Sequence, residues 1–131
     1  MSLKTLENDY EDVFSCGASV APVVDWRLYD TYYTERYMGL DDDKNDYNYT
    51  RASAVALVEA LRHKKYFLLH GTYDDNVHYQ NSMILSAALE DADILFREQA
   101  YPDQDHSISK YRTHLDHSLT DFFLNDCFGK V

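Results

Sequence analysis

Acidic residues and a histidine follow two segments of this sequence that are expected to form strands. Asp74 and Asp75 come after the apolar run from Tyr66 to Gly71, and His106 comes in the loop after the segment from Ile94 to Tyr101. Short apolar runs that end at Gly or Pro are typical of buried strands in a parallel sheet. Reactive groups gather at the carboxyl ends of such strands, so these side chains are expected to lie close together. An imidazole that is oriented by a carboxylate can accept the proton of a nucleophile and so activate it.

Other interpretations of these residues stay open at this stage. The chain has 6 His and 23 acidic residues, so an Asp-rich loop and a His-containing loop also arise by chance. Asp74, Asp75, His78 and His106 could bind a metal ion, but their spacing matches no zinc or calcium signature. The sequence therefore predicts neither a metal site nor a cofactor.

Two short apolar runs, a third segment that ends before Pro102 and three helical patterns predict the elements that position these residues. Strands are expected from Cys16 to Pro22, from Tyr66 to Gly71 and from Ile94 to Tyr101, and helices from Ala52 to Leu61, from Gln80 to Ala92 and from Leu115 to Phe128. Strands that alternate with helices indicate an α/β fold with right-handed parallel crossovers. Three parallel strands are few for a complete domain, because a parallel sheet needs both faces covered. The pattern therefore predicts the last part of a larger sheet.

The segment from Trp26 to Tyr37 is rich in aromatic residues. A helical turn there would gather several rings on one side, either as a packed cluster or as the wall of a pocket. The acidic stretch from Gly39 to Asn48 that follows contains helix breakers and predicts a solvated loop.

Composition limits the partners of the chain. The 131 residues carry 12 basic and 23 acidic side chains, a formal charge of −11 that would repel nucleic acids and anionic lipids. No signal peptide and no membrane-spanning stretch are visible. Cys16 and Cys127 stand near opposite ends and could be free thiols or a disulfide, and Asn48 begins an Asn-Tyr-Thr glycosylation sequence.

Several blocks of residues together resemble a known family. They are Val20 to Val23, Trp26, Tyr29-Asp30, Tyr33 to Gly39, His70-Gly71-Thr72, Asp74 to His78 and Asp105-His106. From about Phe14 to Phe128 the chain resembles the end of the catalytic domain in the dipeptidyl peptidase IV subgroup of the prolyl oligopeptidase family. The resemblance implies the C-terminal portion of an α/β-hydrolase fold, and the acid-then-His order agrees with the later part of the Ser, Asp, His order of such enzymes.

The resemblance also implies roles for individual residues. Asp74 would be the acid and His106 the general base of a serine exopeptidase that releases dipeptides with Pro or Ala in second position. A small hydrophobic proline pocket would be formed by Val23, Trp26, Tyr29, Tyr33 and Val77, with Asn76 and Arg36 as polar residues beside it. A disulfide would join Cys16 to Cys127, Asn48 would be glycosylated, the protein would be secreted or on the cell surface, and the segments from Gln80 to Ala92 and from Leu115 to Phe128 would take part in a homodimer.

The chain departs from the family pattern at the nucleophile. No Gly-x-Ser-x-Gly sequence occurs, and Ser2 lacks the flanking glycines that a nucleophile elbow needs. Residues 1–131 are therefore interpreted as a partial hydrolase domain without elbow or propeller, and the isolated chain is expected to be inactive. Ser107 stands where relatives commonly have Gly, which would stiffen the loop that bears His106.

Two functions other than a peptidase are also consistent with the sequence. The chain could belong to a non-catalytic family member that acts as a binding partner of membrane proteins, or it could be a small binding module in its own right. The presence of Asp74, His106, Tyr29 and Tyr33 together favours a catalytic protein, because a binding partner has no physical need for that set.

Overall fold

The central strand, β2 (Lys65–Gly71), carries apolar side chains on both faces. Tyr66 and Leu68 enter one hydrophobic cluster, whereas Phe67 and Leu69 enter a second one. Successive residues of a strand point to opposite faces, so a continuous apolar run requires cover on both sides.

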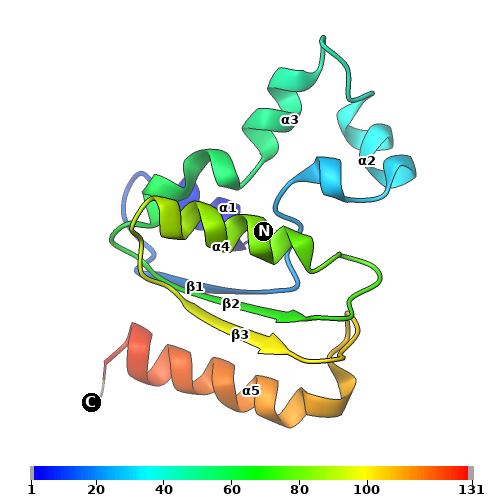
Figure 1. The fold of residues 1–131 in the computed structure, drawn as a ribbon. Helices are drawn as coiled ribbons and strands as arrows, with labels where there is room; N and C mark the ends of the chain where they lie inside the picture. Colours follow the sequence, from blue (N-terminus) through cyan, green and yellow to red (C-terminus); the bar gives the residue numbers. More distant parts are fainter. Residues whose placement is uncertain (1, 130–131) are drawn as a thin grey trace.

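The computed structural model describes residues 2–129, which contain one three-stranded sheet in the order β1-β2-β3. The outer strands are β1 (Cys16–Val20) and β3 (Arg97–Tyr101), and both pair with β2 in parallel. All three arrows point the same way in Figure 1, so the carboxyl ends of the strands lie at one edge. This arrangement confirms the predicted α/β class with three parallel strands.

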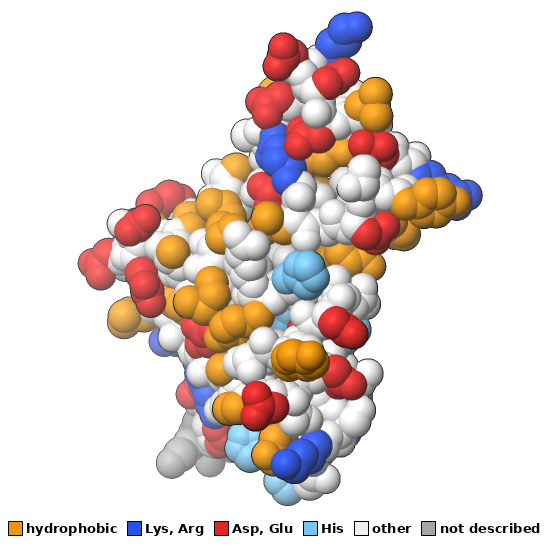
Figure 2. All heavy atoms as spheres, turned by 45° about the vertical axis from the view of Figure 1, so that its right-hand side comes forward, with side chains coloured by type: hydrophobic (Ala, Val, Ile, Leu, Met, Phe, Trp, Pro, Cys, Tyr) orange, Lys and Arg blue, Asp and Glu red, His pale blue; other side chains and the backbone are white. Residues whose placement is uncertain are grey.

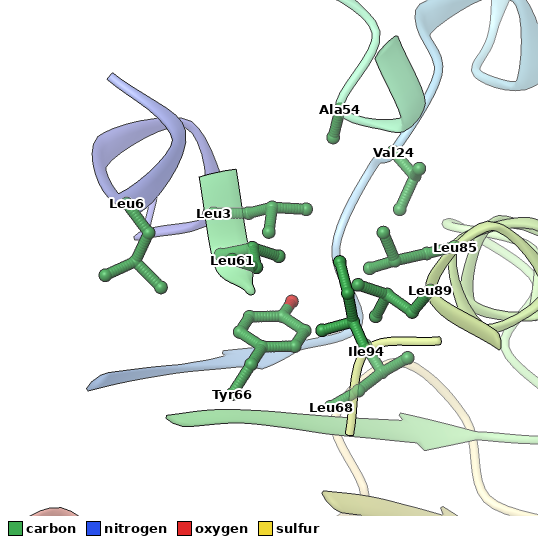
Figure 3. Close-up of a cluster of buried hydrophobic side chains, with 10 residues drawn as sticks. All are labelled: Leu3, Leu6, Val24, Ala54, Leu61, Tyr66, Leu68, Leu85, Leu89 and Ile94. Atoms are coloured by element: carbon green, nitrogen blue, oxygen red, sulfur yellow. The ribbon is translucent and has the colours of Figure 1, made fainter. Parts of the chain in front are cut away.

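Helices cover both faces of this sheet (Figure 1). One face is covered by α1 (Ser2–Glu7), α4 (Gln80–Asp91) and the 3₁₀ segment η2 (Val55–Leu61), whose apolar residues form the cluster drawn in Figure 3. The other face is covered by α5 (Arg112–Asp121) and the π-helical segment η4 (Phe122–Cys127). Within residues 2–129, no helix has the length and apolar character needed to cross a bilayer.

A lobe projects from the edge of the helical layer that contains α4 (Figure 1). It consists of η1 (Trp26–Leu28), α2 (Thr31–Met38) and α3 (Asp46–Ala52). Arg27 joins two of these elements, since its Nη2 lies 2.7 Å from Asp46 Oδ1. Figure 2 shows carboxylates gathered over this upper part of the molecule, in agreement with the negative charge of the chain.

The structure corrects several predicted boundaries in and around the lobe. The predicted helix from Ala52 to Leu61 was wrong, because α3 ends at Ala52 and η2 begins only at Val55. Between them Ser53 is extended, and the N–H of Ala54 donates to the carbonyl of Val24 instead of continuing the helix. Tertiary hydrogen bonding here overrides helix propensity.

Smaller differences occur elsewhere in the chain. The stretch predicted as a loop up to Asn48 already enters α3 at Asp46, and the first and third strands are shorter than expected. The aromatic segment is divided by Asp30, whose Oδ1 accepts the Tyr33 N–H at 2.9 Å and so caps α2. An Asp at this position satisfies a donor that the first helical turn leaves unpaired.

A disulfide joins the two cysteines, which confirms the pairing implied by the resemblance. Cys16 begins β1 and Cys127 ends η4, with a sequence separation of 111 and a distance of 5.8 Å between their Cα atoms. This separation lies within the usual range for a disulfide. The bond therefore ties an outer strand to the last helical segment.

We expect Glu7→Gln to raise the stability of the chain at neutral pH. The Glu7 side chain is fully buried, and although Lys4 Nζ lies 2.8 Å from its Oε2, burial dominates and raises the pKa of Glu7. A carboxyl with a raised pKa in the folded state contributes stability at low pH that is lost as the pH rises through that pKa. Urea unfolding at pH 4 and pH 7 measures this loss.

The exposed Glu11 provides the matched control, because Glu11→Gln removes a charge from the solvated loop after the same helix. Glu11→Gln should show the same change in stability between the two pH values as wild type, and Glu7→Gln should show a smaller loss or a larger gain than both. An equal change in all three proteins would show that Glu7 does not titrate as its burial requires.

Candidate active site

Asp74 lies in the turn that follows β2, with its side chain fully buried. Its Oδ1 accepts the backbone N–H groups of Asn76 at 3.0 Å and Val77 at 2.9 Å. Its Oδ2 lies 2.8 Å from His106 Nδ1 and 3.0 Å from His70 Nε2. Each carboxylate oxygen therefore has two hydrogen-bond partners, which fixes the orientation of the group.

These partners also determine the charge of Asp74. Burial opposes ionisation, but the hydrogen bond from His106 and the backbone N–H groups of Asn76 and Val77 outweigh it and hold the pKa of Asp74 below its ordinary value. Asp74 is therefore a carboxylate at neutral pH and acts only as an acceptor.

His106 is positioned by the loop after β3, which is hydrogen-bonded to the turn after β2. The N–H of Thr72 donates to the carbonyl of Tyr101, and the N–H of Tyr73 donates to the carbonyl of Gln104, both at 3.0 Å. The N–H of Asp103 donates to Thr72 Oγ1 at 3.0 Å. Three hydrogen bonds thus hold the acid turn and the histidine loop together.

The backbones of these two segments also touch directly. A Cβ atom added to Gly71 would lie 2.6 Å from the carbonyl oxygen of Asp105 and still closer to that of Gln104. Only glycine allows this approach, which brings His106 within reach of Asp74.

The end of the histidine loop is anchored in the core. Ile108 is fully buried in the cluster under α5 and has φ 50°, an unusual conformation for a β-branched residue. Asp105 Oδ1 accepts the N–H groups of Ser107 at 3.0 Å and Ile108 at 3.1 Å. These contacts fix the backbone on both sides of His106.

The geometry assigns the tautomer of His106. Nδ1 faces a carboxylate and therefore carries the proton that it donates to Asp74. In the neutral ring Nε2 is then unprotonated, and within residues 2–129 it has no hydrogen-bond partner. The side chain is 42% exposed, so the imidazole can accept a proton from a group outside the described contacts.

An aromatic cluster lies in the lobe. The ring centroid of Tyr33 lies 6.2 Å from that of Trp26 and 5.7 Å from that of Tyr29. Tyr29 Oη donates to Asn76 Oδ1 at 3.1 Å, which connects the cluster to the turn of Asp74. Three of the predicted pocket residues therefore form one cluster, which is connected through Tyr29 to the turn that carries Asp74.

The remaining residues of the predicted pocket differ in how deeply they are buried. Val77 is buried directly after Asn76, and Val23 is half-buried before η1. Arg36 is exposed, and its guanidinium lies over the ring of Tyr37, 5.6 Å from the centroid. A hollow of about 160 Å³ is lined by Trp26, Tyr33, Thr34, Tyr37 and Met38, of which the last three were not predicted.

His70, Ser82 and Gly71 also belong to this site, although they were not predicted from the sequence. His70 and Asp74 are four residues apart, and the His-Gly pair at the end of an apolar run was the available signal. Ser82 lies one turn into α4, and its sequence context gives no indication of a contact with β2. Among residues 2–129, no group of three or more metal-ligating side chains is assembled.

Comparison with known proteins identifies the family. A sequence model of the prolyl oligopeptidase family matches residues 1–130 of the chain. The chain belongs to the prolyl oligopeptidase family. The match confirms the family that the sequence blocks resemble.

Relatives within this family have dipeptidyl peptidase names. The chain is 50% identical over 127 residues to venom dipeptidyl peptidase 4 of Apis mellifera, covering 95% of this chain and 16% of the relative. It is 46% identical over 120 residues to dipeptidyl peptidase 4 of Sus scrofa, covering 89% and 16% respectively. The chain thus spans about a sixth of the length of these relatives.

A solved structure supports the same fold. Dipeptidyl peptidase 4 of Porphyromonas gingivalis superposes with a TM-score of 0.85 at 38% identity, covering 92% of this chain and 17% of that one. The α/β-hydrolase type of fold implied by the sequence is therefore confirmed for the described part of this prolyl oligopeptidase family chain.

Proposed function

We propose that this chain supplies the acid, the base and part of the substrate pocket of a serine dipeptidyl peptidase. The observation that carries the proposal is the 2.8 Å contact between His106 Nδ1 and the buried carboxylate of Asp74. The dipeptidyl peptidase relatives support the reaction class.

His106 would act as general base and then as general acid. Its Nε2 takes the proton of a serine hydroxyl as the hydroxyl attacks the scissile carbonyl, and it later gives this proton to the leaving amine. The negative charge of Asp74 stabilises the imidazolium that forms between these steps. The hydrogen bonds to both oxygens of Asp74 hold this charge in place.

The nucleophilic serine would come from residues outside this sequence. None of the 131 residues lies in a Gly-x-Ser-x-Gly elbow, and we take residues 1–131 as a partial hydrolase domain. Without a nucleophile, covalent catalysis has no first step. We therefore propose that residues 1–131 alone do not hydrolyse peptides.

Substrates with Pro or Ala in second position would fit the aromatic cluster. The pyrrolidine ring of proline is rigid and has no N–H, so flat aromatic walls such as Trp26, Tyr29 and Tyr33 can bury it without leaving a donor unpaired. Asn76 would bind the N-terminal part of the substrate or a carbonyl. Val23, Val77 and Arg36 would complete and order the surroundings.

An extracellular location and a homodimer belong to the same proposal. The Cys16–Cys127 disulfide suits an oxidising compartment, and Asn48 is exposed on α3, where a glycan could be attached. For the dimer, α4 and the C-terminal helical segment have exposed apolar residues at Met83, Leu124 and Phe128.

A chimera tests the proposed function. We would replace the matching segment of the Apis mellifera venom dipeptidyl peptidase 4 by this chain and measure hydrolysis of Gly-Pro-p-nitroanilide. The chimera should be active, whereas residues 1–131 alone should show no hydrolysis.

The control is the same chimera with His106→Ala, which removes the base. A folded chimera no more active than this control would contradict the peptidase proposal and favour a non-catalytic binding role. Folding is checked by circular dichroism, so that inactivity from misfolding is recognised.

A further inference from the structure

His70 is a buried histidine that takes no part in the proton transfers described above. It lies on β2 one residue before Gly71, and 1% of its surface is exposed. Both ring nitrogens have partners: Nδ1 lies 2.7 Å from Ser82 Oγ, and Nε2 lies 3.0 Å from Asp74 Oδ2 and 2.8 Å from the carbonyl oxygen of Val77. Tyr79 packs against the ring edge-on, with 5.4 Å between centroids.

These partners determine which nitrogen of His70 carries the proton in the neutral ring. Nε2 faces the carboxylate of Asp74 and the carbonyl of Val77, which are both acceptors, so Nε2 is the donor. Nδ1 is then an acceptor, and the hydroxyl of Ser82 donates to it. A chain of donors thus runs from Ser82 on α4 through His70 to Asp74.

We propose that His70 is a positioning residue that holds the Asp74 carboxylate in the orientation required by His106. This inference rests on the proposed function, since it concerns the same acid–base pair. Asp74 Oδ2 accepts two N–H groups, one from each histidine, while Oδ1 accepts two backbone N–H groups. Without the donor of His70, Oδ2 would keep only His106, which sits on a loop with a 42% exposed side chain.

A role limited to core packing does not explain this arrangement. An apolar ring at position 70 would fill the same space without requiring a donor from Ser82. It would leave Asp74 Oδ2 and the carbonyl of Val77 facing an apolar surface, which is costly for a buried charge. Groups that orient the partners of a reacting residue typically change activity about 10- to 100-fold when they are removed, as seen for metal sites.

Two substitutions separate positioning from packing. In the chimera, His70→Phe keeps an aromatic ring but removes the donor, and His70→Gln keeps an amide N–H near the place of Nε2. We expect kcat for Gly-Pro-p-nitroanilide to fall about 10- to 100-fold in His70→Phe with little change in KM, and His70→Gln to recover most of the loss. Rates are compared below the unfolding midpoint of each variant.

Recovery by Gln is the readout that a purely structural role would not produce. If His70→Phe keeps kcat within twofold of the parent, or if His70→Gln is as slow as His70→Phe, the positioning role is overturned. Asp74→Asn in the same chimera distinguishes a failure of the proposed function from a failure of the inference about His70. If Asp74→Asn is fully active, the proposed function fails; if only His70→Phe is fully active, the inference about His70 fails alone.

Nitrogen NMR of the ¹⁵N-histidine-labelled 131-residue chain gives an independent readout that needs no nucleophile. The neutral His70 ring should show the tautomer protonated at Nε2, and Ser82→Ala should shift the Nδ1 resonance because its hydrogen bond is lost. A ring protonated at Nδ1 would place the donor on the side of Ser82 and would overturn the proposal.

Discussion

Asp74→Asn is expected to lower kcat of the chimera by about 10⁴-fold, the size of effect seen when a triad acid is replaced by its amide. The structure gives the reason, since both carboxylate oxygens of Asp74 accept two N–H groups each. An asparagine has one acceptor oxygen, so its NH₂ group must face either the backbone donors or the two imidazoles. The measurement is kcat for Gly-Pro-p-nitroanilide.

Asp75→Asn is the matched control, because it removes the same charge from the adjacent, exposed residue. It should leave kcat within about twofold of the parent, as expected for a surface change away from the reacting groups. Asp74→Asn with more than a tenth of the parental kcat, in a protein of unchanged circular dichroism, would show that Asp74 is not the acid.

Gly71→Ala is expected to lower kcat by about 10²-fold, although position 71 bears no functional group. The new methyl group would collide with the carbonyl oxygens of Gln104 and Asp105, which are backbone atoms and cannot turn away. The histidine loop must therefore move, and a misplacement of about 1 Å at a reacting group can cost about 10²-fold in rate. Both kcat and the unfolding midpoint should fall.

Gly129→Ala serves as control for backbone strain without a collision, because Gly129 has φ 74°, which strains an alanine, while its Cβ would meet no atom within 4 Å. Its kcat should equal that of the parent. If Gly71→Ala also has parental kcat, the contact between β2 and the histidine loop is not needed to place His106.

β1 and β2 could be predicted from the sequence because each is a short apolar run with a clear end, whereas β3 has the mostly polar sequence Arg-Glu-Gln-Ala-Tyr and begins three residues later than predicted. In β2 the alternate residues fill two different clusters, so the pattern has no polar interruption. The lobe was less predictable, since the end of α3 depends on a hydrogen bond from Ala54 to Val24, thirty positions earlier. Local propensity does not contain such tertiary information.

The candidate site could likewise be predicted only in part from the sequence. The proximity of Asp74 and His106 followed from one rule, that the carboxyl ends of parallel strands meet at one edge. The roles of the aromatic residues came from family resemblance and stay predictions, while the structure shows that Trp26, Tyr29 and Tyr33 form one cluster. The contact between His70 and Ser82 was not predicted, because it joins a strand to a helix through side chains and nothing in the sequence around Ser82 indicates a partner on β2.

The disulfide between Cys16 and Cys127 closes the chain into a covalent ring, and both functional loops and the lobe are parts of this ring. A ring cut once remains a single molecule. Cleavage by a protease in the exposed, acidic stretch around residues 41–44 would therefore leave both parts of the lobe attached to Asp74 and His106. The part before the cut stays attached through the disulfide, and the part after the cut stays attached through the continuous chain. Only a reducing agent would then let the two pieces separate.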